Sequence, residues 1–134
     1  MKKTASLLLL MLFMVNLAGC RLVRIEEEDR KPLSYTLVEP GQLPEEARKM
    51  VEEKKAEEFR LTYQSGENLY LIRGYGRQLS GGYSICVKEV SASSTAIFFK
   101  TELKGPSPEE QGGTPSYPYI AIKMEYRAAP VQFQ

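Results

Sequence analysis

Residues 59–75 read FRLTYQSGENLYLIRGY, two runs rich in aromatic and aliphatic residues that meet at a short polar segment. From Phe59 onward, apolar residues recur with a period of two, which is typical of β-strands that bury one face. The segment SGEN at residues 65–68 has the glycine and small polar residues that favour a tight turn. The sequence therefore predicts a β-hairpin with strands at residues 59–64 and 68–75.

The same period continues toward the C-terminus. We expect further strands at residues 82–91, 94–103 and 117–127, and a short one at residues 131–133. The 117–127 segment places Ile120, Ile122, Met124 and Tyr126 on one face and Ala121, Lys123 and Glu125 on the other. One buried face and one solvated face predict an antiparallel sheet.

Before this run of strands, the pattern is that of a helix. Leu43, Ala47, Met50 and Val51 recur at helical spacing, and Pro44 suits the first helical position. We expect a short strand at residues 35–39 and an amphipathic helix at residues 44–57 that packs on its own sheet. The predicted fold class is α+β, an antiparallel β-sheet or incomplete β-sandwich of about five to seven strands with one packed amphipathic helix.

The first nineteen residues have the organisation of an export signal. Lys2 and Lys3 precede an apolar run that is too short to span a bilayer, and residues 17–20, Leu-Ala-Gly-Cys, resemble the bacterial lipobox. In such signals the cysteine receives diacylglycerol, whose two acyl chains hold a protein at a membrane. We expect residues 1–19 to be a lipoprotein signal peptide and Cys20 to anchor the protein, extracytoplasmically, to a bacterial cell membrane or envelope. An ordinary signal peptide with an incidental Cys20, or an uncleaved anchor helix, is the alternative.

Residues 20–32 are expected to form a tether between the lipid and a domain at residues 33–134. The segment is dense in charge and ends at Pro32, which favours a solvated connection over an acidic docking patch. Removal of Lys2 and Lys3 leaves sixteen basic against seventeen acidic side chains. Nucleic-acid binding needs a net basic footprint, so we expect no nucleic-acid partner.

The chain contains no histidine and a single aspartate, Asp29. Catalytic sites that pair a serine or cysteine with histidine therefore cannot be assembled, and zinc and calcium sites lack their usual ligands. We expect no catalytic residue, no metal and no cofactor. If Cys20 carries lipid, Cys86 has no partner in the chain, and its place within a predicted strand favours a small apolar role over a redox or intermolecular one.

Two irregular segments interrupt the predicted strands, at residues 74–83 and 105–116. The first is rich in Gly and the second in Gly and Pro, and recognition surfaces are often built from loops on a rigid sheet. Tyr and Arg are frequent interface anchors. The candidate partner-binding residues are Arg77, Gly81, Gly82, Tyr83, Tyr117, Pro118 and Tyr119. Arg73 and Tyr75 would extend this contact patch, whereas packing of the tyrosine rings within the sheet is the alternative.

Residues 69–72, the glycines Gly74 and Gly76, and residues 80–85, SGGYSI, resemble the C-terminal domain of the PrcB family. Residues 106–108, the YPYI segment at residues 117–120 and residues 131–133 fit the same pattern, so that the resemblance covers about residues 33–133. The family takes its name from an accessory lipoprotein of a surface protease complex. The resemblance implies a membrane-anchored, non-enzymatic binding or accessory module whose partner is an exported protease or a subunit of its complex.

A second likeness is to the chagasin-type inhibitors of cysteine proteases, which present three loops from an immunoglobulin-like sandwich. The corresponding order here is residues 79–83, then Gly112 and Gly113, then residues 117–119. The Asn-Pro pair, the Arg and the Trp of those inhibitor loops are missing from these segments. This likeness implies a rival function, in which the same Gly/Pro/Tyr loops plug the active-site cleft of a protease.

Overall fold

The computed structural model of the chain describes residues 29–110 and 112–134. The predicted signal peptide, Cys20 and most of the predicted tether lie outside these residues. Pro32–Gln134 forms a compact unit by itself. In chain order the elements are β1 (Lys31–Pro32), β2 (Thr36–Leu37), the 3-10 turn η1 (Pro40–Gln42), α2 (Glu45–Lys54), β3 (Glu58–Ser65), β4 (Asn68–Tyr75), β5 (Ser84–Ala92), β6 (Ile97–Lys104), β7 (Tyr119–Glu125) and β8 (Val131–Phe133).

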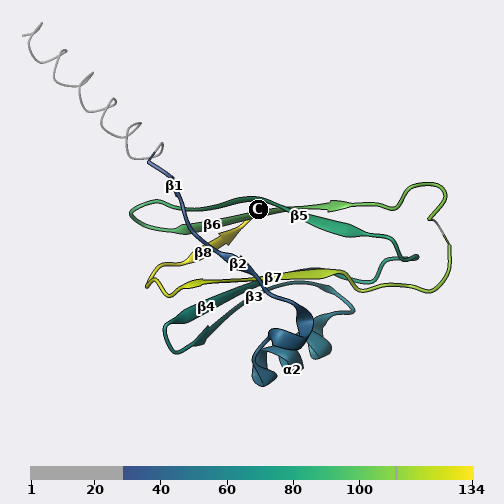
Figure 1. Cartoon of the computed structure of the whole chain (residues 1–134), viewed down its shortest axis with the longest axis horizontal. Helices are drawn as coiled ribbons and strands as arrows, with labels where there is room; N and C mark the ends of the chain where they lie inside the picture. Colours follow the sequence, from purple (N-terminus) through teal and green to yellow (C-terminus); the bar gives the residue numbers. More distant parts are fainter. Residues whose placement is uncertain (1–28, 111) are drawn as a thin grey trace, which may run out of the picture. The chain divides into compact units, whose positions relative to one another are not determined.

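The strands form two four-stranded sheets that face each other (Figure 1). One has the order β1-β5-β6-β8 and the other the order β2-β7-β4-β3. The broad α+β class predicted from the sequence is confirmed. The expectation of an all-antiparallel sheet is wrong at one place, because β8 pairs parallel to β6, with Val131 opposite Ile97 and Phe133 opposite Phe99.

The hairpin at residues 58–75 is the longest continuous pairing in the second sheet. It extends from Glu58 opposite Tyr75 to Ser65 opposite Asn68, which leaves a two-residue turn. Gly66, the first of the two turn residues, has a φ of +60°, whereas the second, Glu67, does not have a positive φ. This combination is that of a type II′ turn, which requires a positive φ at its first central residue. The predicted strand at residues 68–75 is confirmed at both ends.

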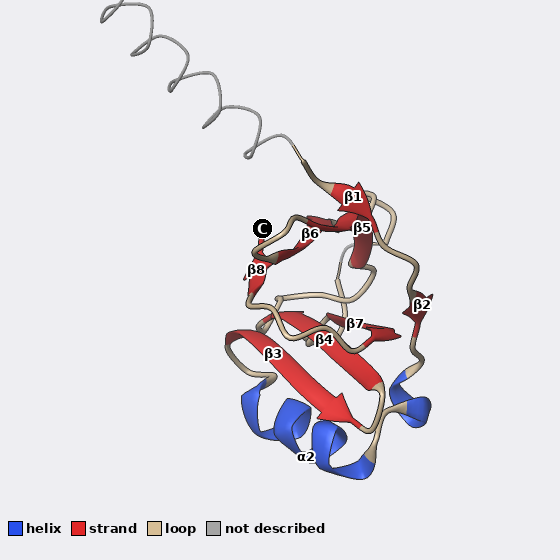
Figure 2. Ribbon diagram, turned by 90° about the vertical axis from the view of Figure 1, so that its left-hand side faces the viewer, coloured by secondary structure: helices blue, strands red, loops and turns tan. Residues whose placement is uncertain are grey.

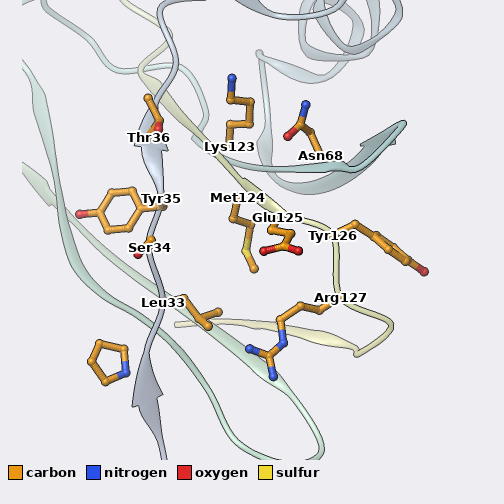
Figure 3. Close-up of a pocket in the computed structure, with 11 residues that line it drawn as sticks. Leu33, Ser34, Tyr35, Thr36, Asn68, Lys123, Met124, Glu125, Tyr126 and Arg127 are labelled. Atoms are coloured by element: carbon orange, nitrogen blue, oxygen red, sulfur yellow. The ribbon is translucent and has the colours of Figure 1, made fainter.

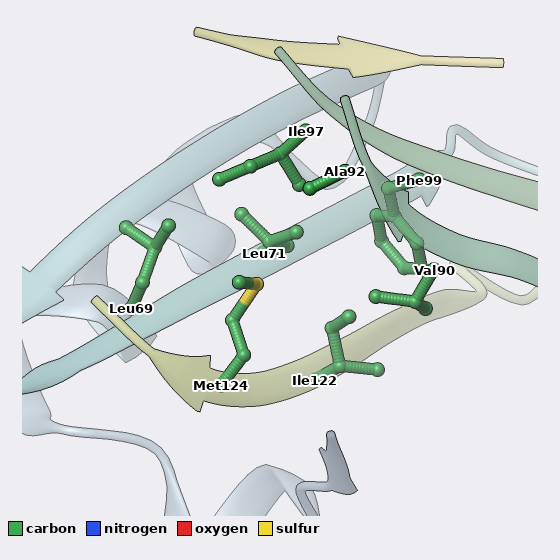
Figure 4. Close-up of a cluster of buried hydrophobic side chains, with 8 residues drawn as sticks. All are labelled: Leu69, Leu71, Val90, Ala92, Ile97, Phe99, Ile122 and Met124. Carbon is green, nitrogen blue, oxygen red and sulfur yellow. The ribbon is translucent and has the colours of Figure 1, made fainter. Parts of the chain in front are cut away.

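The main core lies between the two sheets. Leu71, Ile97, Phe99 and Ile122 are almost completely buried there. Figure 4 shows side chains from β4 and β7 meeting those from β5 and β6 in this layer. The buried members of this cluster are Leu69, Leu71, Val90, Ala92, Ile97, Phe99, Ile122 and Met124.

A second cluster lies on the outer face of the β3–β4–β7 sheet, where α2 covers it (Figure 2). Leu43, Ala47 and Val51 pack there with a set of sheet residues. The buried sheet residues of this cluster are Phe59, Tyr70, Ile72 and Ala121. The helix is shorter than predicted, Pro44 is its N-cap residue instead of its first helical residue, and Met50 is exposed at 38%.

Gly74 is required by a close approach within this second cluster. It lies opposite Phe59 in the β3–β4 pairing, and a Cβ at Gly74 would lie 2.0 Å from Cε1 of the Phe59 ring. Real Cβ contacts are never that short, so any side chain at residue 74 would displace the ring. The glycine therefore lets an aromatic ring lie flat across its neighbouring strand.

A β-bulge in β5 lets both Val87 and Val90 face the core, although they are three residues apart. The register shifts between Val87, which lies opposite Thr101, and Glu89, which lies opposite Lys100. Lys88 is the extra residue, and beyond it Val90 faces Phe99 in the main core. Regular alternation would have turned either Val87 or Val90 to the outer face.

The prediction of one wet face on the 117–127 strand is wrong at Ala121. Ile122 and Met124 face the main core as expected, but Ala121 on the other face is 2% exposed because it lies in the cluster under α2. The strand is therefore buried on both faces along much of its length. Its solvated residues are Glu125 and, just beyond the strand, Tyr126.

Candidate functional site

The two irregular segments predicted from the sequence meet at one end of the domain, where β4 and β6 end (Figure 1). The Gln78 N–H donates to the Ser116 carbonyl at 2.8 Å, and the Ser116 N–H donates back to Gln78 at 3.0 Å. The Ser116 hydroxyl also donates to the carbonyl of Ser80 at 2.7 Å. We call residues 76–83, 105–110 and 112–118 the loop cluster, because these bonds join the two segments into one surface.

Gly82 provides a second junction within the loop cluster. Its φ is +83°, and a Cβ at this position would lie 2.8 Å from Cβ of Pro106. The missing side chain therefore allows the two segments to touch, whereas Gly81 has open space around it. Tyr83 packs its ring near Gly105, so it also belongs to this junction.

Arg77 connects the loop cluster to the turn between α2 and β3. Its backbone N–H donates to the Ala56 carbonyl at 3.3 Å, and its side chain is exposed. Leu79, two residues later, is 82% exposed. Leu79 was predicted only as the first residue of the 79–83 loop in the likeness to the inhibitors and was not a candidate anchor, because a single leucine between polar residues gives no periodic signal by which its exposure could be recognised.

Tyr117, Pro118 and Tyr119 have three different environments. The Tyr117 ring is 38% exposed and has Nζ of Lys55 at 5.4 Å from its centroid, within cation–π range. The Pro118 carbonyl accepts the Tyr75 N–H at 3.0 Å, so Pro118 continues the sheet pairing. Tyr119 is half-buried against the cluster under α2.

Electrostatics near α2 follow from these environments. Burial raises the pKa of the Tyr119 phenol, and the nearby carboxylate of Glu52 adds to the effect. A hydrogen bond to Glu52 raises the pKa of Lys55, so this ammonium group stays charged beside Tyr117. Tyr117 thus offers an exposed ring with a bound cation, while Tyr119 contributes mainly to packing.

The structure brings all seven predicted contact residues to one end of the domain, but it separates them by exposure. Arg77, Gly82 and Tyr117 are exposed, whereas Gly81, Tyr83, Pro118 and Tyr119 are half-buried. The suggested extension of the patch through Arg73 is wrong, because Arg73 is 8% exposed and lies between the sheets. Tyr75 also points inward, where its hydroxyl is hydrogen-bonded to that of Thr101.

Cys86 lies in a different environment from the one predicted. It is half-buried opposite Glu102, on the outer face of the β5–β6 pair that also carries Lys88. Nζ of Lys88 lies 3.0 Å from a Glu102 oxygen, and this hydrogen bond lowers the pKa of Glu102. The thiol therefore adjoins charged side chains instead of an apolar core.

A hollow lies at the end opposite the loop cluster. It has a volume of about 670 Å³, and Figure 3 shows side chains from residues 33–36 and from residues 123–127 on its two sides. Its lining mixes the ring of Tyr35 with the charged groups of Lys123, Glu125 and Arg127. The first residues of the domain and the last residues of β7 thus lie on opposite sides of this hollow.

Within residues 29–110 and 112–134, no three acidic, cysteine or histidine side chains are placed to hold a metal ion. In the same part of the chain, no helix has the length and apolar character needed to cross a bilayer.

Comparison with known families identifies the part of the chain that carries the loop cluster. Residues 69–125 match the family model described as PrcB C-terminal. These residues belong to the PrcB C-terminal domain family. No curated protein and no solved structure matches the chain.

The match to the PrcB C-terminal family covers β4 to β7 and both segments of the loop cluster. All seven candidate contact residues therefore lie within it. The resemblance noted in the sequence extended over about residues 33–133, and the match supports its central part. The helix α2, the strand β3 and the strand β8 lie outside the matched residues.

Proposed function

We propose that the chain is a lipoprotein anchored through diacylglycerol on Cys20, and that its PrcB C-terminal domain is a non-enzymatic accessory module. Its partner is another exported protein, a protease or a subunit of a protease complex, which binds the loop cluster. The observation that carries the proposal is the cross-bonded surface at residues 78, 80 and 116, which holds Leu79 and Arg77 out to solvent at one end of the domain. The absence of histidine from the chain favours binding over catalysis.

The position of the loop cluster fits an anchored protein. Pro32 and Leu33 lie beside residues 124–127, at the C-terminal end of β7, whereas the loop cluster immediately precedes the start of β7. A strand of seven residues spans about 20 Å, at roughly 3.4 Å per residue. An anchor that precedes residue 32 therefore leaves the loop cluster at the far end of the domain, where a partner has free access.

The contact is tested with the intact lipoprotein crosslinked in its own cells. The Leu79→Glu substitution places a charge at the most exposed apolar side chain of the loop cluster, so we expect it to abolish recovery of an exported protease or its subunit. Leu37→Glu is the matched control, because Leu37 is 60% exposed but lies in β2, away from the loop cluster. Equal recovery of the partner by both variants would refute binding through the loop cluster.

Tyr117→Ala gives a second test of the same surface. Tyr117 is exposed, so its removal should weaken the partner contact without lowering the thermal stability of the domain. Tyr119→Ala removes a ring that packs against the cluster under α2, and we expect it to destabilise the domain instead. The two tyrosines therefore have to be changed separately.

The inhibitor function is distinguished by activity assays. An accessory module leaves the activity of cysteine proteases unchanged, whereas an inhibitor would lower it at stoichiometric concentration and lose this effect when Gly82 is changed to Ala. The anchor is tested by mass spectrometry of the mature N-terminus and by Cys20→Ser. We expect a diacylglyceryl-modified Cys20, and loss of the protein from the membrane fraction in the variant.

A further inference from the structure

The strand β3 has a free edge. It is the last strand of the order β2-β7-β4-β3, and in the described parts of the chain only β4 pairs with it. Half of the backbone N–H and C=O groups of such a strand point away from the sheet and can pair with another extended chain. The free edge of β3 runs for eight residues.

A groove follows this edge on the inner side of the sheet. Arg60, Thr62 and Gln64 of β3 line a hollow of about 610 Å³ together with residues 126–131 and Phe133. Arg60 also lines an adjoining hollow of about 300 Å³ with Glu58, Phe59 and Arg73. Figure 2 shows β3 and β8 on the same side of the domain. The two hollows share Arg60 as a lining residue, and we call them together the edge groove.

The edge groove contains more cationic than anionic groups. Arg60 lies directly opposite Arg73 in the β3–β4 pairing, and Arg127 lines the same groove. Among the described residues that line the groove, the one carboxylate is that of Glu58, which forms an ion pair with Arg73. Like charges placed opposite each other on neighbouring strands are unfavourable, so this cluster favours an additional anion.

Arg73 is the most confined of these groups. Its side chain is 9% exposed, its guanidinium carbon lies 4.8 Å from the centroid of the Tyr75 ring, and its Nε is buried without a hydrogen-bond acceptor among the described residues. Glu58, in contrast, is 59% exposed and can turn toward solvent. The fixed positive charge is thus built into the sheet, while its present counterion is at the surface.

We propose that the edge groove binds an extended acidic segment of a partner protein, which adds to β3 as a further strand. Side chains of the added strand that point inward meet Arg60 and Arg127, which requires carboxylates. Side chains that point outward continue the face of Leu61 and Tyr63, which are partly buried apolar residues of the cluster under α2. The preferred segment therefore alternates acidic with apolar residues.

A second copy of this chain does not meet these requirements. Two β3 strands paired edge to edge would bring the Arg60–Arg73 pair of one copy toward that of the other, and the same charges oppose such self-association. No residue that lines the edge groove belongs to the loop cluster, so its partner segment need not belong to the protein that contacts Leu79.

The experiment uses the full chain in a non-ionic detergent and two labelled peptides, acetyl-EVEVEV-amide and acetyl-KVKVKV-amide. We expect fluorescence anisotropy to show saturable binding of the acidic peptide only. Arg60→Glu should weaken that binding by about tenfold or more, because it replaces an attractive charge with a repulsive one. Lys100→Glu makes the same charge change on the outer face of β6 and should leave the affinity within about twofold.

Hydrogen exchange on the unsubstituted protein locates the peptide independently of any variant. We expect the acidic peptide to increase the protection of backbone amides in residues 58–65. In the anisotropy experiment, we expect Leu79→Glu to leave the affinity of the protein for the acidic peptide unchanged. Equal binding of both peptides, no binding of the acidic peptide, or protection confined to residues 76–83 would each overturn the proposal. Failure of Leu79→Glu to release a cellular partner would instead count against the loop cluster alone.

Discussion

The layer between the two sheets has two halves of different character. Toward the β3–β4 turn the buried side chains of its core cluster are apolar, such as Leu69, Ile97 and Met124. Toward the loop cluster it contains the ion pair of Arg73 with Glu58 and the hydroxyl pair of Tyr75 with Thr101. Apolar burial is the main source of folding free energy, whereas buried polar pairs contribute little net stability. The comparison indicates that one half stabilises the fold and the other fixes the geometry next to the binding surfaces.

The largest effect is expected in the apolar half. Phe99 is 1% exposed, and Phe99→Ala should lower the free energy of unfolding by about 3–5 kcal/mol, because it removes a buried ring and leaves a cavity. Denaturant unfolding measures this change. Leu37→Ala, at an exposed residue, is the control and should stay within about 0.5 kcal/mol. A loss below about 1 kcal/mol for Phe99→Ala would remove the distinction between the halves.

A smaller effect is expected for the ion pair. Glu58→Ala leaves the buried guanidinium of Arg73 without its counterion, and we expect a loss of about 1–2 kcal/mol, reduced from the value for a fully buried pair because Glu58 is half in solvent. Glu57→Ala, at the exposed neighbouring residue, should have almost no effect. If the two variants unfold at the same denaturant concentration, Glu58 does not compensate Arg73.

The hydrogen bond between the hydroxyls of Tyr75 and Thr101 should contribute less to the free energy of unfolding than the ion pair does. Tyr75→Phe keeps the ring over Arg73 but removes the hydrogen bond to Thr101, so the expected loss is about 1 kcal/mol. Thermal unfolding of this variant is compared with that of Tyr35→Phe, which changes an exposed tyrosine. An unchanged melting temperature for Tyr75→Phe would show that the polar half makes no cross-sheet link.

The smallest effect concerns pH. Burial raises the pKa of Tyr119 above its ordinary value of about 10, so its contribution to stability is complete below that pH and is lost as the pH rises through the raised pKa. Ultraviolet titration of the protein minus that of Tyr119→Phe isolates this phenol. A Tyr119 that ionises at or below the ordinary value would place its ring in solvent, next to Tyr117.

Local pattern was sufficient to predict the hairpin at residues 58–75, the strand β8 and the general α+β class. The pairing of the strands could not be predicted, because β2 with β7 and β6 with β8 are joined by contacts between residues far apart in sequence. The bulge at Lys88 was missed since an extra residue leaves the composition of a strand unchanged. These features depend on tertiary packing, which periodicity does not report.

Local sequence pattern likewise located the segments that form the candidate site, but not the exposure of their residues. Gly and Pro in residues 74–83 and 105–116 marked the segments that meet, because they signal irregular backbone. Exposure within them could not be read from residue type, since Leu79 is exposed and Arg73 is buried, each against its usual preference. The edge groove was not visible in the sequence, because an edge strand is defined by the partner it lacks.

The two shortest strands determine how the domain responds to mechanical load. β1 and β2 are each two residues long, and they are the first elements of the domain, with the Leu33 N–H bonded to Val90 and Thr36 paired with Lys123. A pull that arrives through residue 32 would peel these few hydrogen bonds one after another while both sheets stay folded. Releasing residues 32–38 gives about 20–25 Å of slack, at roughly 3.5 Å per residue. The first residues of the domain can thus extend under load before either sheet unfolds.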